Sequence, residues 1–378
     1  MTKDNSKTVL IIGTNMMNLY NHRLELINEL LHLGYKVAVA TPEGREAENL
    51  VKTGCQFIPM AVDNRGTNIK RDIKLIKDLR RIYNTVKPDI ILTFYTKTNI
   101  YGGLVARSMK IPYLENICGL GTSLVKENML GKFMRLLYKN ALKKASFVFF
   151  QNKDNIRFIT GNKIYNGPHD LLPGSGVSLP RYPILSYPHN KNPEFLFCSR
   201  IIKEKGIDEY LEAARKIKIK YPDTIFHVAG PCDPSYEEIV KNAHEDGTII
   251  YHGKILDLHP LLQQTHCTIH PSYYPEGMAN ILLESAASGR PLITTPLPGC
   301  GETVTDNVTG FVVKEKDPAD LSRVIEKFIL LSPEAKEKMG LEGRKKMEKE
   351  FNRDIVIHQY VEHIKEILDH HENHNNRR

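Results

Sequence analysis

At 378 residues the chain is too long for one ordinary hydrophobic core, so we expect two domains that each bury their own apolar face. Hydrophobic residues make up 41% of the sequence and charged residues 25%, which is typical of a soluble protein, and the formal net charge is +8. No segment approaches about 18 uninterrupted apolar residues and the N-terminal apolar run is too short for a signal peptide, which argues against membrane-spanning and exported proteins.

Continuous apolar runs and helical spacing alternate along the first half of the chain. Buried parallel strands are predicted at residues 8–14, 35–42, 89–95, 112–117 and 146–152. Helices are predicted at residues 22–34, 69–83, 100–109 and 126–144. Residues 171–195 contain five prolines, which indicates a connector rather than a further strand or helix.

A second alternating series begins at residue 195. Its predicted strands lie at residues 195–200, 224–230, 248–253, 267–272, 291–296 and 310–314. Its predicted helices lie at residues 207–220, 236–244, 258–264, 278–289, 318–331 and 333–351, and a last amphipathic helix follows at 355–368. Regular alternation of strands and helices predicts parallel sheets with helices on both faces, here formed twice.

The predicted fold class is therefore α/β, with two Rossmann-like, doubly wound parallel-sheet domains that face each other across a cleft. We expect an N-terminal domain at residues 1–180, a linker at 181–193 and a C-terminal domain at 194–352. The helix at 353–370 is expected to pack back towards the N-terminal domain, and the polar tail at 371–378 to be disordered. Ligands of such sheets bind beyond the carboxyl ends of the strands, so the loops there are the candidate sites.

The positive charge belongs to the N-terminal half of the chain. Residues 1–185 carry 27 Lys and Arg against 14 Asp and Glu, whereas residues 186–378 carry 25 against 30. Basic residues concentrate at 65–87 and at 126–144, and the second segment spaces its apolar side chains as one helical face surrounded by cations. Two interpretations remain open for that helix: an interfacial helix attracted to anionic lipid, or a solvated basic face over an ordinary core stripe.

The stretch HPSYYPEGMANILLESAASGRP, residues 270–291, joins a strand end to a proline-rich turn and a helix that we expect to begin near Met278. Glu276 precedes this helix and Glu284 lies one turn inside it. Backbone N–H groups at the start of the helix favour an anion. Were both glutamates helical, they would lie about 12 Å apart along the axis, whereas the two carboxylates of a glycosidase lie about 5–9.5 Å apart. This distance argues against hydrolysis by the pair.

Both halves of the chain carry a distinctive series of motifs. The second half carries FLFCSRIIKEKGIDEYLEAARKIK, PSYYPEG, two glutamates in a Glu-x7-Glu spacing, and PLPGCGE. The first half carries LYNHRLELINELLHLGYKV, TKTNIYGGLVAR, IPYLENICGLG and LLPGSGV. Taken in order, the motifs of the second half resemble the retaining GT-B glycosyltransferases of family 4, and those of the first half are similar to the branch that builds bacterial capsular, O-antigen and lipid-linked oligosaccharides. The resemblance covers nearly the whole chain and implies a nucleotide-sugar-binding C-terminal domain and an acceptor-binding N-terminal domain.

The resemblance implies a donor site for a nucleotide sugar, with a UDP-sugar as the expected donor. Arg200 and Lys205, at a strand's carboxyl end, would hold the diphosphate and oppose the negative charge that develops as it leaves. Glu276 would face the sugar, Glu284 would accept hydrogen bonds from the ribose, and Arg200, Lys205 and Glu276 are the expected catalytic residues. The further donor-binding candidates are Lys254 and Ile255 beside the base, and Gly277, Met278, Ala279, Asn280 and Ile281 at the helix start.

The acceptor-binding candidates follow strands of the N-terminal domain. They are Asn15, Asn21, His22, Arg23, Lys97, Asn99, Tyr101, Gly119 and Gly121. Where many relatives carry a histidine this chain has Cys118, so assistance from a histidine is not expected. The resemblance implies same-face attack with the leaving phosphate taking the proton, so no protein general base is named. Glu115 is either a polar contact or a packed strand-end carboxylate. The six cysteines form no CxxC pair and no strand ends in a DxD motif, so no metal or other cofactor is expected to be required.

Together these features predict a cytoplasmic enzyme, peripheral on the inner face of the cytoplasmic membrane. It would move a hexose or N-acetylhexosamine from a UDP-sugar, with retention, onto an undecaprenyl-diphosphate-linked saccharide during synthesis of capsule, O-antigen or a related polysaccharide. Two alternatives remain: a nucleotide-sugar epimerase of the same architecture, and a non-enzymatic nucleic-acid-binding protein that uses the basic half. Nucleic acid is not the expected partner, because the cations lack the interleaved aromatic residues of a stacking platform.

Overall fold

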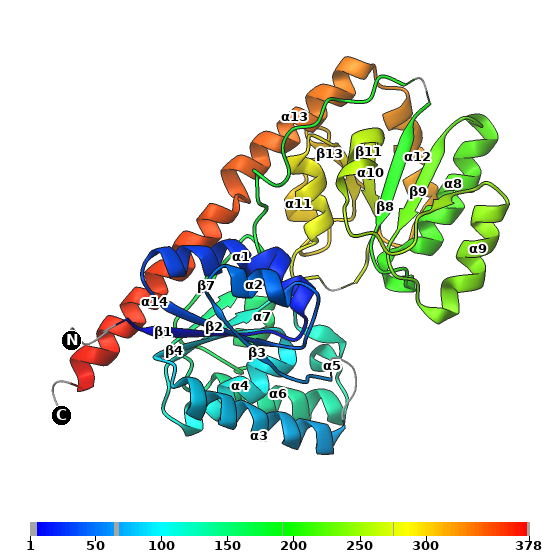
Figure 1. Cartoon of the computed structure of the whole chain (residues 1–378). Coiled ribbons are helices and arrows are strands. Elements are labelled where there is room, and N and C mark those ends of the chain that lie inside the picture. Colours follow the sequence, from blue (N-terminus) through cyan, green and yellow to red (C-terminus); the bar gives the residue numbers. More distant parts are fainter. Residues whose placement is uncertain (1–5, 64–67, 191, 275, 376–378) are drawn as a thin grey trace. The chain divides into compact units, whose positions relative to one another are not determined.

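The computed structural model describes residues 6–63, 68–190, 192–274 and 276–375. The chain divides into two compact units, one formed by Met1–Ser175 with Asp354–Arg378 and the other by Gly176–Arg353 (Figure 1). In the described part of the chain each unit holds one sheet, and all of its paired strands run parallel. The prediction of an α/β fold with two doubly wound parallel sheets is thereby confirmed.

The first unit is built on a sheet with the order β3-β2-β1-β4-β5-β6-β7, seven strands within the described residues. The strands are β1 (Thr8–Ile12), β2 (Lys36–Thr41), β3 (Gln56–Pro59), β4 (Ile90–Phe94), β5 (Tyr113–Ile117), β6 (Phe147–Phe150) and β7 (His169–Leu171). The helices are α1 (Met16–His32), α2 (Ala47–Lys52), α3 (Ile69–Val86), α4 (Thr96–Ser108), α5 (Gly121–Val125), α6 (Met129–Leu142), α7 (Lys153–Gly161) and α14 (Arg353–Asn375). Val9 and Ile11 of β1 belong to one buried cluster and Leu10 and Ile12 to another, which explains why the strand is apolar at every position after Thr8.

The second unit holds a sheet with the order β10-β9-β8-β11-β12-β13, six strands over the described ranges. The strands are β8 (Glu194–Cys198), β9 (Ile225–Ala229), β10 (Ile250–Tyr251), β11 (Cys267–His270), β12 (Leu292–Thr294) and β13 (Gly310–Val312). The α-helices are α8 (Ile207–Lys220), α9 (Glu237–Glu245), α10 (His259–Gln264), α11 (Asn280–Ala287), α12 (Pro318–Ile329) and α13 (Pro333–Glu350). The strand order reverses between β1 and β4 in the first sheet and between β8 and β11 in the second, although all the paired strands stay parallel. Sheets of this kind bind ligands at the carboxyl ends of the strands beside such a switch point.

The long helix α14 ends the described chain, and its apolar stripe is buried in the core of the first unit. The Tyr360 ring lies 4.9 Å from the Phe149 ring and 6.0 Å from the Phe94 ring. The polar tail expected to be disordered from residue 371 is helical as far as Asn375, and Glu372 there forms an ion pair with Lys7. A polar segment can remain helical here because it extends a helix that packing has already nucleated; residues 376–378 lie outside the described residues.

The sequence pattern misses five short elements of the first unit. They are α2, β3, α5, α7 and β7. The strands β3 and β7 lie at the two edges of the sheet, and none of their residues is buried, so neither has an apolar run. The helices span between five and nine residues, which is too short for a periodic pattern to emerge.

The proline-rich segment expected as a linker at residues 181–193 belongs to the second unit, which begins at Gly176. Tyr182 and Tyr187 are buried there. The buried guanidinium of Arg290 donates to the carbonyl oxygen of Ser186 at 2.7 Å. The prolines correctly indicate the absence of regular structure, but the packing of the segment follows from the tyrosines that lie between them.

Candidate active site

The loops after the neighbouring strands β8 and β11 bring the three predicted catalytic residues into one site. Arg200 follows β8, Lys205 ends the short 3₁₀ turn Lys203–Lys205, and Glu276 lies in the loop after β11. The Lys205 ammonium forms an ion pair with the Glu276 carboxylate, and only 9% and 13% of these side chains is exposed. The exposed Arg200 and the buried Lys205 lie 5.6 and 5.0 Å from the centre of the same ring, that of Tyr274.

Gly206 allows the turn that carries Lys205 to approach the loop after β11. Its φ is +80°, and a Cβ at this position would lie 2.2 Å from the carbonyl oxygen of Pro271. The two loops are also hydrogen-bonded, since the N–H of Tyr273 and the hydroxyl of Ser272 donate to the Glu204 carbonyl at 2.9 and 3.3 Å. A side chain at 206 would force these loops apart, so the Lys205–Glu276 contact depends on the glycine.

The electrostatics of this site favour an anion. Burial lowers the pKa of Lys205 to about 8; the nearby Cys300 thiol opposes this shift and the Arg200 guanidinium adds to it. Two cations held close together in a partly dry site disfavour each other's charged form, and a bound anion would favour it. The site can therefore hold a group with several negative oxygens.

The helix start after Glu276 differs from the prediction. Helix α11 begins at Asn280 rather than near Met278, and its N-cap residue is Ala279. The Ala279 N–H donates to the carbonyl oxygen of Gly299 at 2.8 Å, so it is already used and cannot contact a phosphate as we expected. Because Glu276 lies outside the helix, the helical spacing assumed between the two glutamates does not apply.

Glu284 lies within α11 in a cluster that sequence reasoning missed. Burial raises the pKa of its carboxyl to about 7, although a hydrogen bond from Tyr182 and the charges of Arg181, Arg353 and His259 lower it. The ring of Tyr182 stacks on that of His259, with centroids 5.1 Å apart. Tyr182 is the available signal in the sequence, because a large aromatic residue in a proline-rich segment is rarely left exposed.

The predicted base-binding loop follows β10. Lys254 is exposed and Ile255 is partly buried against the core of the unit. The Gly253 carbonyl accepts a hydrogen bond of 2.8 Å from the N–H of Gly230, which ties the start of the loop to the end of β9.

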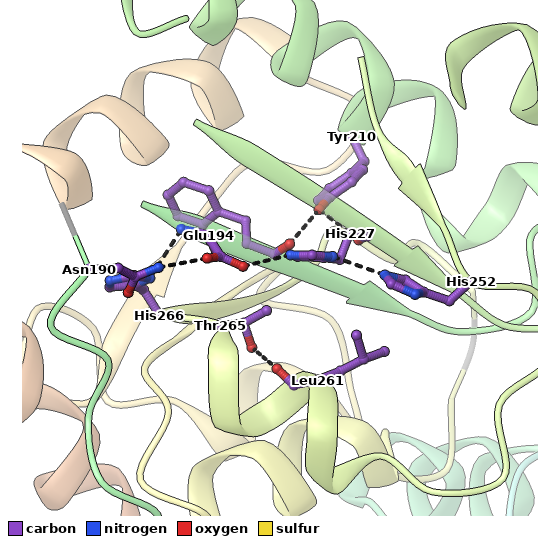
Figure 2. A network of polar contacts seen from close by, with 9 residues as sticks. Asn190, Glu194, Tyr210, His227, His252, Leu261, Thr265 and His266 are labelled. Atoms are coloured by element: carbon purple, nitrogen blue, oxygen red, sulfur yellow. Dashed lines mark hydrogen bonds and ion pairs between the residues drawn. The ribbon is translucent and has the colours of Figure 1, made fainter. Parts of the chain in front are cut away.

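A chain of polar side chains that the sequence did not reveal leads to the same loop (Figure 2). The buried Glu194 carboxylate accepts from the Asn190 amide at 2.6 Å and contacts His227 Nε2 at 2.8 Å. His227 Nδ1 lies 2.9 Å from Nε2 of His252, the residue before Gly253. Because the carboxylate can only accept, His227 donates from Nε2 and accepts at Nδ1 from His252. The network fixes both imidazole orientations, and its only sequence signal is polar residues within otherwise apolar strands.

In the first unit, the acceptor candidates of α1 have structural contacts of their own. Asn15 caps the helix, because its Oδ1 accepts a backbone N–H bond of 2.9 Å from three residues further on. Arg23 is buried, with its guanidinium carbon 4.4 Å from the centre of the Phe94 ring, and it donates to the His22 carbonyl at 3.0 Å. Asn21 and His22 are half-buried.

The three candidates of α4 do not face one ligand as expected. Lys97 Nζ lies 3.0 Å from one oxygen of Asp72, and the Tyr101 hydroxyl donates to the other at 2.8 Å. Asn99 is fully buried, and its amide donates to the Asn116 carbonyl at 2.8 Å. Residues 97 and 101 share a helix face because they are four positions apart, whereas residue 99 points the opposite way. The placement of Asn99 in an acceptor site was therefore wrong, since its side chain is enclosed in the core.

The loops after β4 and β5 contain the remaining candidates. Gly121 begins α5 with φ +68°, and Gly119 is half-buried in the loop before it. Cys118 is half-buried, and burial raises the pKa of its thiol. Tyr95, directly after β4, has φ +73°, a conformation that is rare for a bulky residue and concentrates at functional sites. We therefore add Tyr95 to the candidates.

Glu115 is a buried carboxyl, not a ligand contact. It is fully buried, and within the described residues neither oxygen has a hydrogen-bond partner. Burial raises its pKa well above the usual value, so the folded protein binds a proton that the unfolded chain releases near pH 4.5. The stability that Glu115 provides is thus fully present below that pH and is lost as pH rises towards the folded-state pKa.

Replacing Glu115 by glutamine should therefore raise the free energy of unfolding at pH 8 by about 1 kcal/mol or more, because glutamine has no proton to lose and one pKa unit corresponds to about 1.4 kcal/mol. The gain should shrink as the pH approaches 4.5. Urea unfolding across this pH range measures it, with the exposed Glu48→Gln as the matched control. A pH-independent difference between Glu115→Gln and the natural protein would contradict the assignment.

Two family models match the chain. The model described as glycosyl transferase 4-like matches residues 10–152, and the model described as glycosyl transferases group 1 matches residues 186–346. The chain is 25% identical to N,N'-diacetylbacillosaminyl-diphospho-undecaprenol alpha-1,3-N-acetylgalactosaminyltransferase of Campylobacter jejuni, over 91% of this chain and 94% of the relative. It is 24% identical to the capsular polysaccharide biosynthesis glycosyltransferase CapM of Staphylococcus aureus, over 85% of this chain and 87% of the relative.

Solved structures share the fold at lower identity. A glycosyltransferase from Rickettsia africae aligns with a TM-score of 0.78 at 20% identity, covering 96% of this chain and 99% of that one. The Anabaena protein HepE, solved with UDP and glucose, aligns with a TM-score of 0.77 at 15% identity, covering 95% of this chain and all of that one. The matches to both halves and the two parallel sheets agree with the sequence motifs, and the chain belongs to the GT-B glycosyltransferases of the family 4 type.

Proposed function

We propose that this glycosyltransferase moves a hexose or N-acetylhexosamine from a UDP-sugar, with retention of configuration, onto an undecaprenyl-diphosphate-linked saccharide. The observation that carries the proposal is the convergence of Arg200, Lys205 and Glu276 after β8 and β11. Support for the acceptor comes from the Campylobacter jejuni relative, whose name specifies a diphospho-undecaprenol substrate. Support for the donor comes from the Anabaena structure with UDP and glucose.

In this proposal each donor-site residue binds a different part of the nucleotide sugar. Arg200 and Lys205 hold the diphosphate, where their charge stabilises the leaving group as its bond to the sugar breaks. Glu284 accepts hydrogen bonds from the ribose hydroxyls, Glu276 orients the sugar, and the loop with Lys254 contacts the base. Retention follows if the acceptor attacks from the face that the diphosphate leaves, with a phosphate oxygen taking the proton. No side chain needs to act as a general base in this scheme.

The acceptor is bound by the first unit in this proposal. The carboxyl ends of β1 and β4 form the switch point of its sheet, so Asn21, His22, Tyr95 and the loop that contains Gly119 and Gly121 are its binding residues. Lys97 and Tyr101 are available only if the acceptor's diphosphate competes with Asp72 for them.

A screen of UDP-sugars with an undecaprenyl-diphosphate-linked saccharide, followed by UDP release, tests the proposed reaction. Acceptor-dependent UDP release from one sugar donor, with an α-linked product from an α-linked donor, is the expected result. Formation of a free sugar epimer without any lipid acceptor would instead favour the epimerase alternative. Equal UDP release with and without the acceptor would contradict the proposed acceptor.

The pH dependence of nucleotide binding tests the role of Glu284. Its pKa is about 7 in the free protein, and only the carboxylate can accept both ribose hydrogen bonds. UDP binding should therefore weaken by about tenfold as pH falls from 8 to 6. Calorimetry on the natural protein and Glu284→Gln separates this effect from the titration of UDP itself, which both proteins share. Parallel pH profiles for the two proteins would remove Glu284 from the site.

We also propose that α6 lies against an anionic membrane surface. The apolar face predicted for this helix divides in two: Tyr138 and Leu142 are buried in the core, whereas Met129, Phe133 and Leu136 are 88%, 56% and 57% exposed. Core packing therefore accounts for the apolar side chains near the C-terminal end of α6, whereas those nearer its N-terminal end stay exposed. Within the described ranges, no helix has the length and apolarity to cross a bilayer.

Cations surround the exposed part of α6. Lys132, Lys139 and Lys143 are exposed, and no ion pair of theirs is found among the described residues. A groove of about 590 Å³ beside the helix is lined by Lys139, Lys143 and Lys163 without any acidic side chain. On the same side of the unit, α4 packs against both α6 and the basic helix α3 (Figure 1). Of the basic segment at residues 65–87, residues 65–67 lie outside the described residues. Exposed apolar side chains ringed by lysines suit an anionic lipid surface.

Replacing Lys132, Lys139 and Lys143 by glutamine should weaken binding to vesicles that contain phosphatidylglycerol by about 100-fold, since each lysine near such a surface contributes about 1 kcal/mol. UDP binding should not change. Vesicle sedimentation measures the effect, with the exposed α13 lysines Lys338, Lys345 and Lys349 as the matched control triple. Equal losses from the two triples would identify a net-charge effect and exclude a specific α6 surface. Arg135 is left unchanged because it donates to the Leu124 carbonyl at 3.1 Å and so ties α6 to α5.

A further inference from the structure

His270 lies directly behind the proposed donor site and has no role in it so far. It is the last residue of β11, its side chain is buried, and its carbonyl accepts from the Thr294 hydroxyl at 2.8 Å. In the described part of the chain neither ring nitrogen has a hydrogen-bond partner. Leaving a buried donor and acceptor unpaired destabilises the fold, so such a residue calls for an explanation.

The nearest charged groups are those of the Lys205–Glu276 pair. His270 Nε2 lies 3.6 Å from Glu276 Oε1, just beyond hydrogen-bond distance, and the same oxygen is in contact with Lys205. Burial, together with the charge of Lys205, lowers the pKa of His270 well below its usual value. The ring is therefore neutral and can offer one N–H towards the carboxylate.

We propose that His270 is a positioning residue that becomes a hydrogen-bond donor to Glu276 when the donor diphosphate takes Lys205. The inference rests on the proposed donor site. In the empty protein the ammonium of Lys205 is held by Glu276, so a diphosphate must draw it away. Glu276 then loses the charge of that lysine, while the imidazole needs a movement of only about 0.6 Å to reach a normal hydrogen-bond length.

A neutral imidazole suits this exchange better than the alternatives. A cationic side chain at position 270 would compete with Lys205 for Glu276 in the empty site and would repel Lys205. An apolar side chain would offer no donor, so drawing Lys205 away from a buried carboxylate would become harder. His270 thus lowers the energy needed to release Lys205 and keeps Glu276 oriented towards the sugar.

Titration of UDP into the natural protein and its variants tests the exchange. His270→Leu should weaken UDP binding by about fivefold to 20-fold, whereas His270→Gln, which retains an N–H near Nε2, should stay within about threefold. In a Glu276→Gln background Lys205 is already released, so adding His270→Leu should have no further effect. Equal UDP affinity of His270→Leu and the natural protein, or full additivity with Glu276→Gln, would overturn the proposal.

A spectroscopic measurement on the natural protein does not depend on how the variants fold. In 15N-labelled protein the His270 Nε2–H signal, assigned by its loss in His270→Gln, should move downfield when UDP is added, because a hydrogen bond to a carboxylate forms. An unchanged signal at saturating UDP would exclude the exchange even if the donor site is correct. Failure of the natural protein to bind UDP is a different outcome, which would refute the donor site and the exchange together.

Discussion

Replacing Lys205 by alanine is expected to lower the rate of sugar transfer by about 100-fold or more, the scale observed when an enzyme loses one group that stabilises transition-state charge. The Lys205 side chain is 9% exposed and lies near Arg200, so water cannot easily replace its charge. An Arg fork and a Lys point charge are complementary on a diphosphate, and Arg200 alone should not compensate. Initial rates of UDP release at saturating donor would measure the loss.

The neighbouring Lys203 is the matched control for this experiment. It belongs to the same short turn, but its side chain is exposed. Lys203→Ala should therefore change the rate by less than about twofold, because an exposed lysine is largely solvated. Comparable rates for Lys205→Ala and Lys203→Ala would refute the assignment of Lys205 to the diphosphate. Circular dichroism and urea unfolding of both variants would separate a lost charge from a lost fold.

The architecture could be predicted because it depends on local patterns. Strands buried on both faces form continuous apolar runs, such as Val9–Ile12 of β1, and amphipathic helices such as α8 repeat their apolar residues with helical period. The loop positions of Arg200 and Glu276 follow from the parallel order alone, since ligands bind at the carboxyl ends of strands. That part of the candidate site required no knowledge of side-chain contacts.

The rest of the site depends on which side chains meet, and periodicity does not carry that information. The Lys205–Glu276 pair joins residues that are far apart in sequence, and so does the contact between Glu194 and His227. The helix start at Asn280 is set by a backbone hydrogen bond to Gly299, another distant residue. For Asn99 the sequence motif predicted a ligand contact, but this polar side chain is buried in the core and hydrogen-bonded to the backbone there.

Arg290 illustrates both points, because it lies within residues 270–291, the most informative stretch of the sequence, and yet its side chain is wholly buried in the second unit. Its guanidinium donates to the carbonyls of Leu262 and Ser186 at 2.7 Å each, and to that of Leu185 at 3.3 Å. Leu262 lies in α10 and Arg290 follows α11, so the positive charge meets the carbonyl ends of helices, where negative partial charge collects. One side chain therefore fixes two helices and the proline-rich segment, including the region of Tyr182.

Replacing Arg290 by methionine is expected to lower the free energy of unfolding of the second unit by about 3 kcal/mol or more, because several buried carbonyls lose a charged donor at once. Arg290→Lys should lose somewhat less, because the ammonium keeps a charged donor. It should still lose stability, since a single ammonium cannot reach carbonyls on opposite sides of a planar fork. The exposed Arg323, paired with Asp320 on the surface of α12, provides the control, and Arg323→Met should cost less than about 1 kcal/mol. Urea unfolding at pH 7.5 distinguishes these values. A loss below about 1 kcal/mol for Arg290→Met would mean that water replaces the guanidinium and that α11, with Glu284, is held by its apolar contacts alone.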